Sequence, residues 1–306
     1  AVILLAGALL SSCNPPNYPT KPIELKYYAN GPYAVTVAPG SQCCDSAGNK
    51  FDLYYPSTLT PPPAGFPILT WGNGTNSLSS HYAYFLKHMA SWGFVVIATQ
   101  DLNTGVGTTI LDAAKFMILQ NSSPGLFQNK LNIGQVGAFG HSQGATGAIN
   151  ALEKSGGIIK TVMPIELPAQ IFCSTPQNCA DTSTMTQGSI FLIDGSLDIP
   201  ISPPTQLPGT TGLQSIAAYY SAAPAGIIKV KGTLIGPSHA DVEGSPTCAS
   251  VSLGCVLGVY GYLGYPTAWM MFQLQNDNYA HGAFVSGTGE MFSETANWQN
   301  VASNVP

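Results

Sequence analysis

The sequence predicts a single α/β domain with a mostly parallel central sheet that is covered by helices on both faces. Short apolar segments rich in β-branched residues alternate along the chain with segments of helical periodicity. The apolar segments are nearly continuous, as expected of strands that are buried on both faces. No repeat or long linker divides the 306-residue chain after Pro19, so one three-layer domain accounts for it.

The expected elements follow one another in a regular order. Two segments at the start, residues 32–37 and 50–57, predict an antiparallel pair of strands. The buried strands, the last of which is expected to be the final strand of the chain, lie within residues 66–75, 94–101, 135–142, 158–166, 188–196 and 226–236. The helices are expected at residues 81–93, 108–120, 144–157 and 266–275. Gly93 is typical of a helix end, and Pro266 fits the first turn of the last helix.

Composition excludes some classes of function. Hydrophobic residues make up 45% of the chain, so we expect a folded core rather than disorder. Charged residues make up only 8%, the net charge is -5, and no cluster of Lys and Arg occurs. Nucleic-acid binding needs a basic surface, so that class is excluded. The uncharged segment 244–276 is long enough to suggest a membrane span, but Gly, Tyr and Pro interrupt it, which favours a buried C-terminal helix.

The first residues predict export. Residues 1–16, AVILLAGALLSSCNPP, resemble the end of a secretory signal, in which small residues follow an apolar run. LSSC also resembles a bacterial lipobox, in which Cys13 would carry a lipid anchor; the alternative is an ordinary cleaved signal with an incidental cysteine. We expect residues 1–19 to be a leader and tether, and residues 20–306 to form a secreted or membrane-anchored extracytoplasmic domain.

The cysteines agree with an oxidising compartment. Without Cys13, six of the seven remain and can pair completely. We expect the disulfides Cys173–Cys179 and Cys248–Cys255, each of which would close a short polar loop. A bond between adjacent Cys43 and Cys44 would strain the chain, so their pairing stays open. No paired C-x-x-C spacing occurs, so no metal is expected.

The strongest candidate site motif is GHSQG, residues 140–144. It has the G-x-S-x-G pattern, in which a serine occupies a strained turn between a strand and a helix, with no room for neighbouring side chains. The chain contains 33 glycines, so a chance match is not remote. The expected strand before Ser142 and helix after it favour a nucleophile over a structural serine.

A serine nucleophile needs a histidine base that is oriented by a carboxylate. Asp198, in DGSLDIP, follows a later strand and is the expected acid; Asp194, closer to the strand, is the weaker alternative. Of the five histidines, only His239, in GPSHADV, follows both Ser142 and Asp198 and lies just beyond an expected strand. All three positions follow strand ends, where open α/β sheets bind ligands.

Acyl transfer also needs two N–H donors for the developing oxyanion. The first is expected from Gln143, which follows the serine. The second is expected from Gly74 in WGNGTN, residues 71–76, and Asn73 and Thr75 are the next candidates. The alternative for this loop is a plain glycine turn.

Seven motifs carry a family resemblance: GPYAVTV, DLYYPS, FPILTWGNGT, GHSQGA, DGSLD, GPSHADV and GYPTAWMMFQLQND. Together they resemble the bacterial cutinase-like polyester hydrolases, in the dienelactone-hydrolase-like branch of the α/β-hydrolases. The resemblance covers residues 31–284. It implies an exported esterase with a single α/β-hydrolase domain, a shallow cleft, no lid and no cofactor. Some members of the family cleave polyesters, including poly(ethylene terephthalate).

Three features depart from that family. His141 stands where many polyester hydrolases have a tryptophan that lines the cleft, and GATGA, residues 144–148, replaces a run of glycines. Gly74 stands where those enzymes carry an aromatic residue. Trp71 or the segment 165–172, IELPAQIF, could supply the missing contact. The candidate substrate-binding residues are Trp71, Asn73, Thr75, His141, Glu166 and Leu167.

The sequence therefore predicts a monomeric, secreted serine carboxylester hydrolase that acts on polyesters or short-chain acyl esters. One alternative is a lipase, or an esterase for small esters or plant-wall acyl groups. An alternative from another class is a catalytically silent binding lipoprotein on the hydrolase fold, because a fold does not determine a function.

Overall fold

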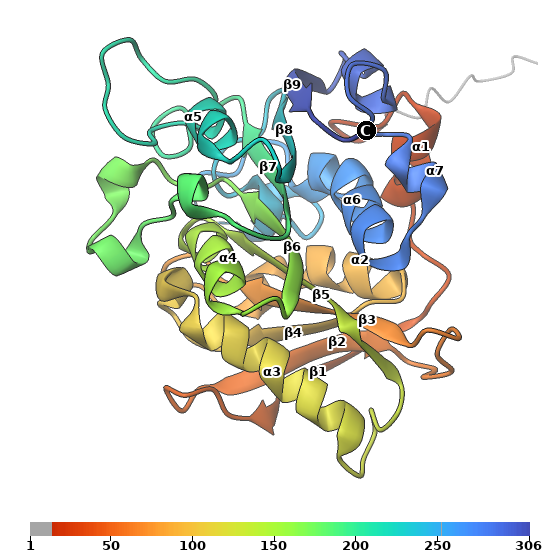
Figure 1. Cartoon of the computed structure of the whole chain (residues 1–306). Helices are drawn as coiled ribbons and strands as arrows, with labels where there is room; N and C mark the ends of the chain where they lie inside the picture. The colour runs from red at the N-terminus through yellow and green to blue at the C-terminus, as the bar shows by residue number, and fades with distance from the viewer. Residues whose placement is uncertain (1–13, 252) are drawn as a thin grey trace, which may run out of the picture.

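A computed structural model describes residues 14–251 and 253–306, so Cys13 and most of the expected leader lie outside the described residues. The chain forms a nine-stranded sheet between two layers of helices (Figure 1). The strands are β1 (Val35–Cys43), β2 (Lys50–Pro56), β3 (Phe66–Gly72), β4 (Val95–Thr99), β5 (Leu131–His141), β6 (Ile159–Ile165), β7 (Ser189–Gly195), β8 (Ile228–Leu234) and β9 (Trp298–Ser303).

The sheet is mostly parallel, as predicted. Its strand order is β1-β2-β4-β3-β5-β6-β7-β8-β9. The run from β4 to β8 is parallel throughout. β1 and β2 form the expected antiparallel pair at one edge, and β9 is antiparallel to β8 at the other.

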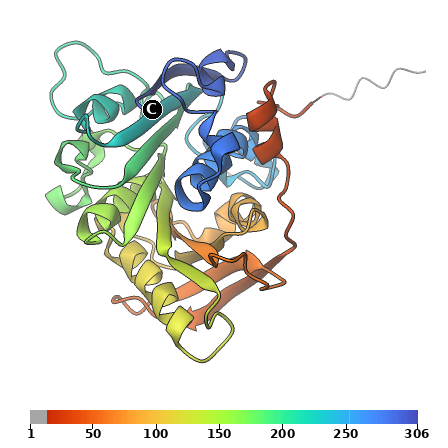
Figure 2. The same cartoon turned by 45° about the vertical axis from the view of Figure 1, so that its right-hand side comes forward.

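Each face of the sheet carries its own hydrophobic core. The helices are α1 (Pro22–Tyr28), α2 (Ala83–Ser91), α3 (Thr108–Ser122), α4 (Gln143–Lys154), α5 (Ile216–Ala222), α6 (Gly264–Gln275) and α7 (Asn278–His281). Helices α1, α2 and α6 cover one face, and α3, α4 and α5 cover the other (Figure 2). Successive residues of β3 enter opposite cores: Ile68 packs with the second group of helices, and Leu69 with the first. This two-sided burial explains the continuous apolar strands.

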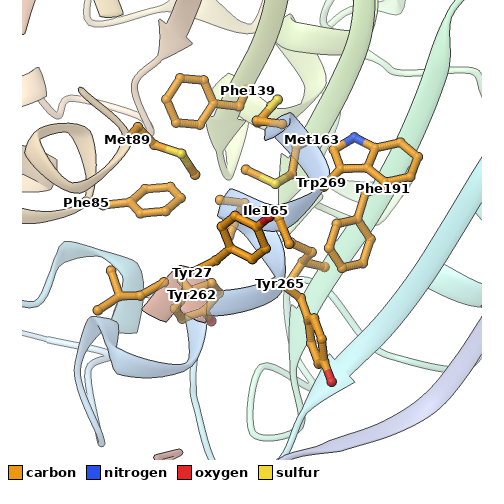
Figure 3. Packing of buried hydrophobic residues seen from close by; sticks show 14 of the residues in the cluster. Tyr27, Phe85, Met89, Phe139, Met163, Ile165, Phe191, Tyr262, Tyr265 and Trp269 are labelled. Atoms are coloured by element: carbon orange, nitrogen blue, oxygen red, sulfur yellow. The ribbon is translucent and has the colours of Figure 1, made fainter. Parts of the chain in front are cut away.

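The core beneath α6 is rich in aromatic side chains. Trp269 of α6 packs against Phe191 of β7, with ring centroids 5.7 Å apart (Figure 3). The ring of Phe284 lies 5.3 Å from that of Trp269. The last part of the uncharged segment 244–276 therefore forms a buried helix, as predicted, and this helix includes Pro266 in its first turn. Among the helices of the described ranges, none is long and apolar enough to cross a membrane.

The structure corrects the expected elements in two respects. The expected strand at 226–236 is not the last strand, because β9 follows it. β9 lies at the sheet edge, and most of its residues are at least partly exposed, so its sequence lacks a strong apolar pattern. Helices α1, α5 and α7 were also not expected. They have seven, seven and four residues, too short for a clear helical period.

The strands bring the candidate residues to one edge of the sheet. Ser142 directly follows β5, Asp198 follows β7, His239 follows β8, and the loop containing Gly74 follows β3. Because these four strands run parallel in one sheet, with only β6 between β5 and β7, their carboxyl ends lie at the same edge.

Candidate active site

Ser142 occupies the strained turn that its motif predicts. Its φ of 54° and ψ of -122° place it in a region that a residue with a side chain rarely adopts. A side-chain carbon on Gly140 would overlap the backbone of Gly144, and one on Gly144 would overlap the backbone of Gly72. Both glycines are therefore required by the close approach of the turn to β3.

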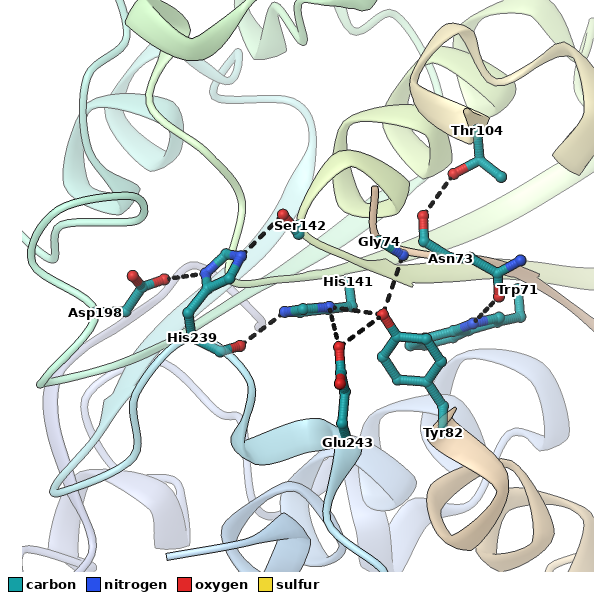
Figure 4. Close-up of polar contacts among 10 residues, drawn as sticks. All are labelled: Trp71, Asn73, Gly74, Tyr82, Thr104, His141, Ser142, Asp198, His239 and Glu243. Carbon is teal, nitrogen blue, oxygen red and sulfur yellow. Dashed lines mark hydrogen bonds and ion pairs between the residues drawn. The ribbon is translucent and has the colours of Figure 1, made fainter. Parts of the chain in front are cut away.

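A chain of hydrogen bonds joins the three residues predicted to act together (Figure 4). Ser142 Oγ lies 2.9 Å from His239 Nε2, and His239 Nδ1 lies 2.6 Å from Asp198 Oδ2. Asp198 is 1% exposed, whereas the His239 side chain keeps 19% of its surface open. It is thus Asp198, and not Asp194, that contacts His239. Asp194 is buried within β7, and this burial raises the pKa of its carboxyl well above the usual range.

The loops that carry the acid and the histidine are bonded to each other. Leu197 N–H donates to the Pro237 carbonyl at 2.9 Å, and Gly236 N–H donates to Ser196 Oγ, also at 2.9 Å. Gly195 is required here because a side chain would overlap the Pro237 carbonyl. The separation between Asp198 and His239 is therefore set by backbone contacts as well as by their own hydrogen bond.

Asp241, which sequence reasoning missed, organises the chain that follows His239. Its buried carboxylate accepts hydrogen bonds from the backbone N–H of Ser238 at 2.7 Å and of Val256 at 3.0 Å. Its other oxygen accepts from Leu257 and Gly258. The only sequence signal was an acidic residue two positions after the histidine, which does not reveal partners fifteen or more residues away.

A second network lies beneath the histidine and connects it to the loop after β3. His141 is 3% exposed, and its ring nitrogens lie 2.7 Å from the His239 carbonyl and 2.9 Å from the Tyr82 hydroxyl. The Tyr82 oxygen also lies 3.1 Å from the Gly74 nitrogen and 3.3 Å from Glu243 Oε1. Tyr82 and Glu243 were not predicted, because neither belongs to a recognisable motif.

Burial determines the direction of these hydrogen bonds. It lowers the pKa of His141 well below the usual range, so the ring is neutral and carries one N–H. The His239 carbonyl can only accept, so His141 Nε2–H donates to it, and Nδ1 accepts from the Tyr82 hydroxyl. The Tyr82 oxygen then accepts from Gly74 N–H. The chain of donors runs from Gly74 through Tyr82 and His141 to the backbone of His239.

This network corrects the predicted oxyanion donors. The N–H of Gly74 already donates to Tyr82, so it is not available to a ligand beside Ser142. Thr75 borders the depression at Ser142, and its N–H has no acceptor among the residues that the structure describes. Gln143 also borders that depression, and as the first residue of α4 its N–H has no partner within the helix. Thr75 and Gln143 thus each offer an N–H at the depression that no other described residue accepts.

The depression at Ser142 has a volume of about 280 Å³. Its lining includes Thr75, Gln143, Ala169, Phe172 and Ile201. Of the expected substrate-binding residues, only Thr75 lines it. Ala169 and Phe172 belong to the expected segment 165–172, although neither was named as a contact.

The other expected contacts are buried and do not line the depression: Trp71, Asn73, His141, Glu166 and Leu167. Trp71 packs against Tyr82 and Phe139, with ring centroids 4.8 and 4.7 Å away, and its Nε1–H donates to Asn73 Oδ1 at 3.0 Å. The proposed replacement of the missing aromatic contact by Trp71 is therefore wrong. These residues lie at or directly after strand ends, and the hydrophobic core still encloses them there. The periodicity of the sequence does not show how far beyond a strand the core extends.

Glu166 instead is buried near Asp198. It lies at the end of β6 with a φ of 50°, and its Oε1 accepts from the Tyr262 hydroxyl. Its Oε2 has no partner within residues 14–251 and 253–306. Glu166, Asp198 and His239 each bring a polar atom within 4.8 Å of the others. Burial, and then the negative charge of Asp198, raise the pKa of Glu166 well above the usual range, which favours its protonated form.

Both expected disulfides are present. Cys173–Cys179 has a Cα–Cα distance of 5.2 Å, and Cys173 lines the depression at Ser142. Cys248–Cys255 has a Cα–Cα distance of 5.6 Å and closes the loop directly before residues 256–258, which Asp241 holds. Cys43 and Cys44, whose pairing the sequence left open, are also joined.

The chain matches no protein-family model and no curated protein. The fold and the site therefore define its class: an α/β protein in which a serine on a strained turn is hydrogen-bonded to a histidine, and the histidine to a buried aspartate.

Proposed function

We propose that this protein is an exported serine carboxylester hydrolase with an α/β-hydrolase domain. The observation that carries the proposal is the hydrogen-bonded chain from Ser142 through His239 to Asp198. A serine so placed has a base within reach, and the base has a buried carboxylate to orient it. The disulfides fit an extracytoplasmic location.

The proposed reaction has two halves. Ser142 Oγ attacks the ester carbonyl while His239 Nε2 takes the hydroxyl proton, and the tetrahedral intermediate then expels the alcohol as His239 returns the proton to it. Water attacks the acyl-enzyme by the same route and releases the acid. Asp198 holds the ring of His239 and stabilises its protonated form.

The oxyanion of each tetrahedral intermediate is assigned to two backbone donors. Gln143 N–H lies at the start of α4, where the helix dipole favours negative charge. Thr75 N–H lies on the opposite loop and takes the role that the sequence suggested for Gly74. This assignment distinguishes two variants: Thr75→Ala keeps the N–H and much of the activity, whereas Thr75→Pro removes it and lowers kcat by about 10²-fold or more.

The proposal is tested by comparing Ser142→Ala with the exposed Ser221→Ala as a matched control. Loss of the nucleophile is expected to lower kcat on p-nitrophenyl butyrate by about four orders of magnitude or more. The wild type and Ser221→Ala should react with a fluorophosphonate probe, and Ser142→Ala should not. If the wild type neither hydrolysed the ester nor took up the probe, the binding lipoprotein would be the correct alternative.

A further inference from the structure

A second depression lies next to the one at Ser142 and is larger. Its volume is about 840 Å³, against about 280 Å³ beside the serine. Its walls come from residues 169–171, from the loop between β7 and α5, residues 196–215, and from Asn300 of β9. A connection of this length without a helix or strand is unusual in a compact domain and is often functional.

The two depressions share a border. Ala169 lines both of them. On one wall Phe172 lines the first and Ile171 the second; on the other, Ile201 lines the first and Pro200 the second. Neighbouring residues of both walls thus continue from one depression into the other, and together they form a groove that leads away from Ser142.

Hydrogen bonds hold the two walls of the groove together. Ala169 N–H donates to the Ile201 carbonyl at 2.8 Å. Gln170 N–H donates to the Leu213 carbonyl at 3.0 Å, and Leu213 N–H donates back to Gln170 Oε1 at 2.9 Å. The long loop is therefore fixed against the segment after β6.

The lining of the groove carries no charge; it mixes apolar side chains with uncharged polar ones, and apolar surface predominates in the second depression. Neither depression is lined by an Asp, Glu, Lys, Arg or His side chain among the described residues. Three aliphatic side chains of the second depression are widely exposed: Ile171 at 78%, Ile199 at 64% and Leu207 at 78%. Apolar side chains gathered around an open hollow are typical of a binding surface.

We propose that this groove binds the chain of a long, uncharged and largely apolar ester, and that the protein prefers such substrates to short ones. This inference rests on the proposed ester hydrolysis. The scissile ester lies at Ser142, the adjoining part of the substrate crosses Ala169, and the distal part contacts Ile171 and Leu207. A butyryl group would be held by the first depression alone.

The test compares p-nitrophenyl decanoate with p-nitrophenyl butyrate, both below their aggregation concentrations. The double variant Ile171→Ser/Leu207→Ser is measured beside Leu119→Ser, which changes a leucine that is 59% exposed on α3. The ratio of kcat/KM for decanoate over butyrate is expected to fall about 10-fold in the double variant, because apolar contact area is lost. It should stay unchanged in the control. An unchanged ratio in the double variant, or an equal fall in the control, would overturn the inference.

A binding measurement separates this inference from the proposed function. Ser142→Ala is combined with each set of substitutions, and equilibrium dialysis measures the Kd of decyl 4-nitrophenyl ether, which has no ester bond. The double variant is expected to bind it about 10-fold more weakly than the Leu119→Ser control. If neither ester is hydrolysed, the proposed function fails, yet the binding difference still supports the groove. Equal Kd values would reject it.

Discussion

The surroundings of His239 and the second depression are built differently. Around the histidine, carboxyl groups are buried and bonded: Asp198, Asp241 and Glu166 are at most 1% exposed. In the second depression, by contrast, Ile171 and Leu207 are both 78% exposed. This difference teaches that the carboxyl groups proposed to hold His239 and its loop in place are enclosed by the protein. The side chains proposed to contact the substrate are instead exposed to solvent.

The largest expected effect is a loss of kcat when Asp198, one of the enclosed carboxyl groups, is replaced. Asp198→Asn should lower kcat on p-nitrophenyl butyrate by about 10³- to 10⁴-fold, because the amide cannot stabilise the protonated ring of His239. Asp194→Asn is the matched control, since Asp194 lies four residues earlier in β7 and does not contact His239. Steady-state kinetics and thermal unfolding of both variants check the prediction. Equal losses of kcat would contradict the assignment of Asp198.

The next effect concerns the network beneath the histidine. Tyr82→Phe removes the hydroxyl that joins Gly74 to His141, and leaves a buried N–H and a ring nitrogen without a partner. We expect kcat to fall about 10-fold, with KM little changed, and unfolding to become easier by about 1 to 3 kcal/mol. Tyr54→Phe is the control, because that buried hydroxyl bonds Ser79 and none of Gly74, His141 and His239. A loss of stability without a loss of kcat would make Tyr82 purely structural.

Each disulfide lies in or next to one of the two regions compared above: Cys248–Cys255 near Asp241, and Cys173–Cys179 beside the depression at Ser142, which borders the second depression. Removing each disulfide in turn therefore tests the comparison. The double serine variants of Cys173–Cys179 and Cys248–Cys255 should each lose about 2 kcal/mol of stability, since the two closed loops are similarly short. Loss of Cys248–Cys255 should lower kcat, because it loosens the segment that Asp241 holds. Loss of Cys173–Cys179 should raise KM instead, because it borders the depression. Both Tm and the separate kinetic constants are measured; the reverse pattern would contradict the division.

The last prediction concerns stability alone, which should depend on pH. The pKa of Glu166 is raised in the folded state, so the folded protein retains a proton that the unfolded chain releases above about pH 4.5. Its contribution to stability is complete below that pH and is lost as the pH rises. Glu166→Gln removes this loss, so its free energy of unfolding, relative to the wild type, should increase by up to about 1.4 kcal/mol per pH unit.

Urea unfolding from pH 4 to pH 8 measures this difference. Glu24 and Asp194, whose pKa values burial also raises, are present in both proteins, so the difference reports Glu166 together with its effect on neighbouring carboxyl groups. A constant difference across the range would show that Glu166 does not change its protonation on unfolding.

Much of the fold was predictable because it depends on local pattern. Buried parallel strands such as β4 and β7 have continuous apolar sequences that few other structures produce. The edge strand β9 and the short helix α5 were not predicted, because their residues pack in place without a strong period of their own. The geometry also agrees with the sequence order of Ser142, Asp198 and His239. It disagrees about Gly74 and Trp71, whose partners lie on other elements.

The sequence by itself determined the alternation of strands and helices, the strained turn at Ser142 and the order in which the serine, acid and histidine follow their strands. These features follow from hydrophobic periodicity and from the conformational freedom of glycine, which act between near neighbours in the chain. Only the tertiary structure decided that Tyr82 takes the N–H of Gly74, that Glu166 lies against Asp198, and that Ala169 joins two depressions into one groove. Those contacts depend on which distant segments the packed sheet brings together, and no local pattern records them.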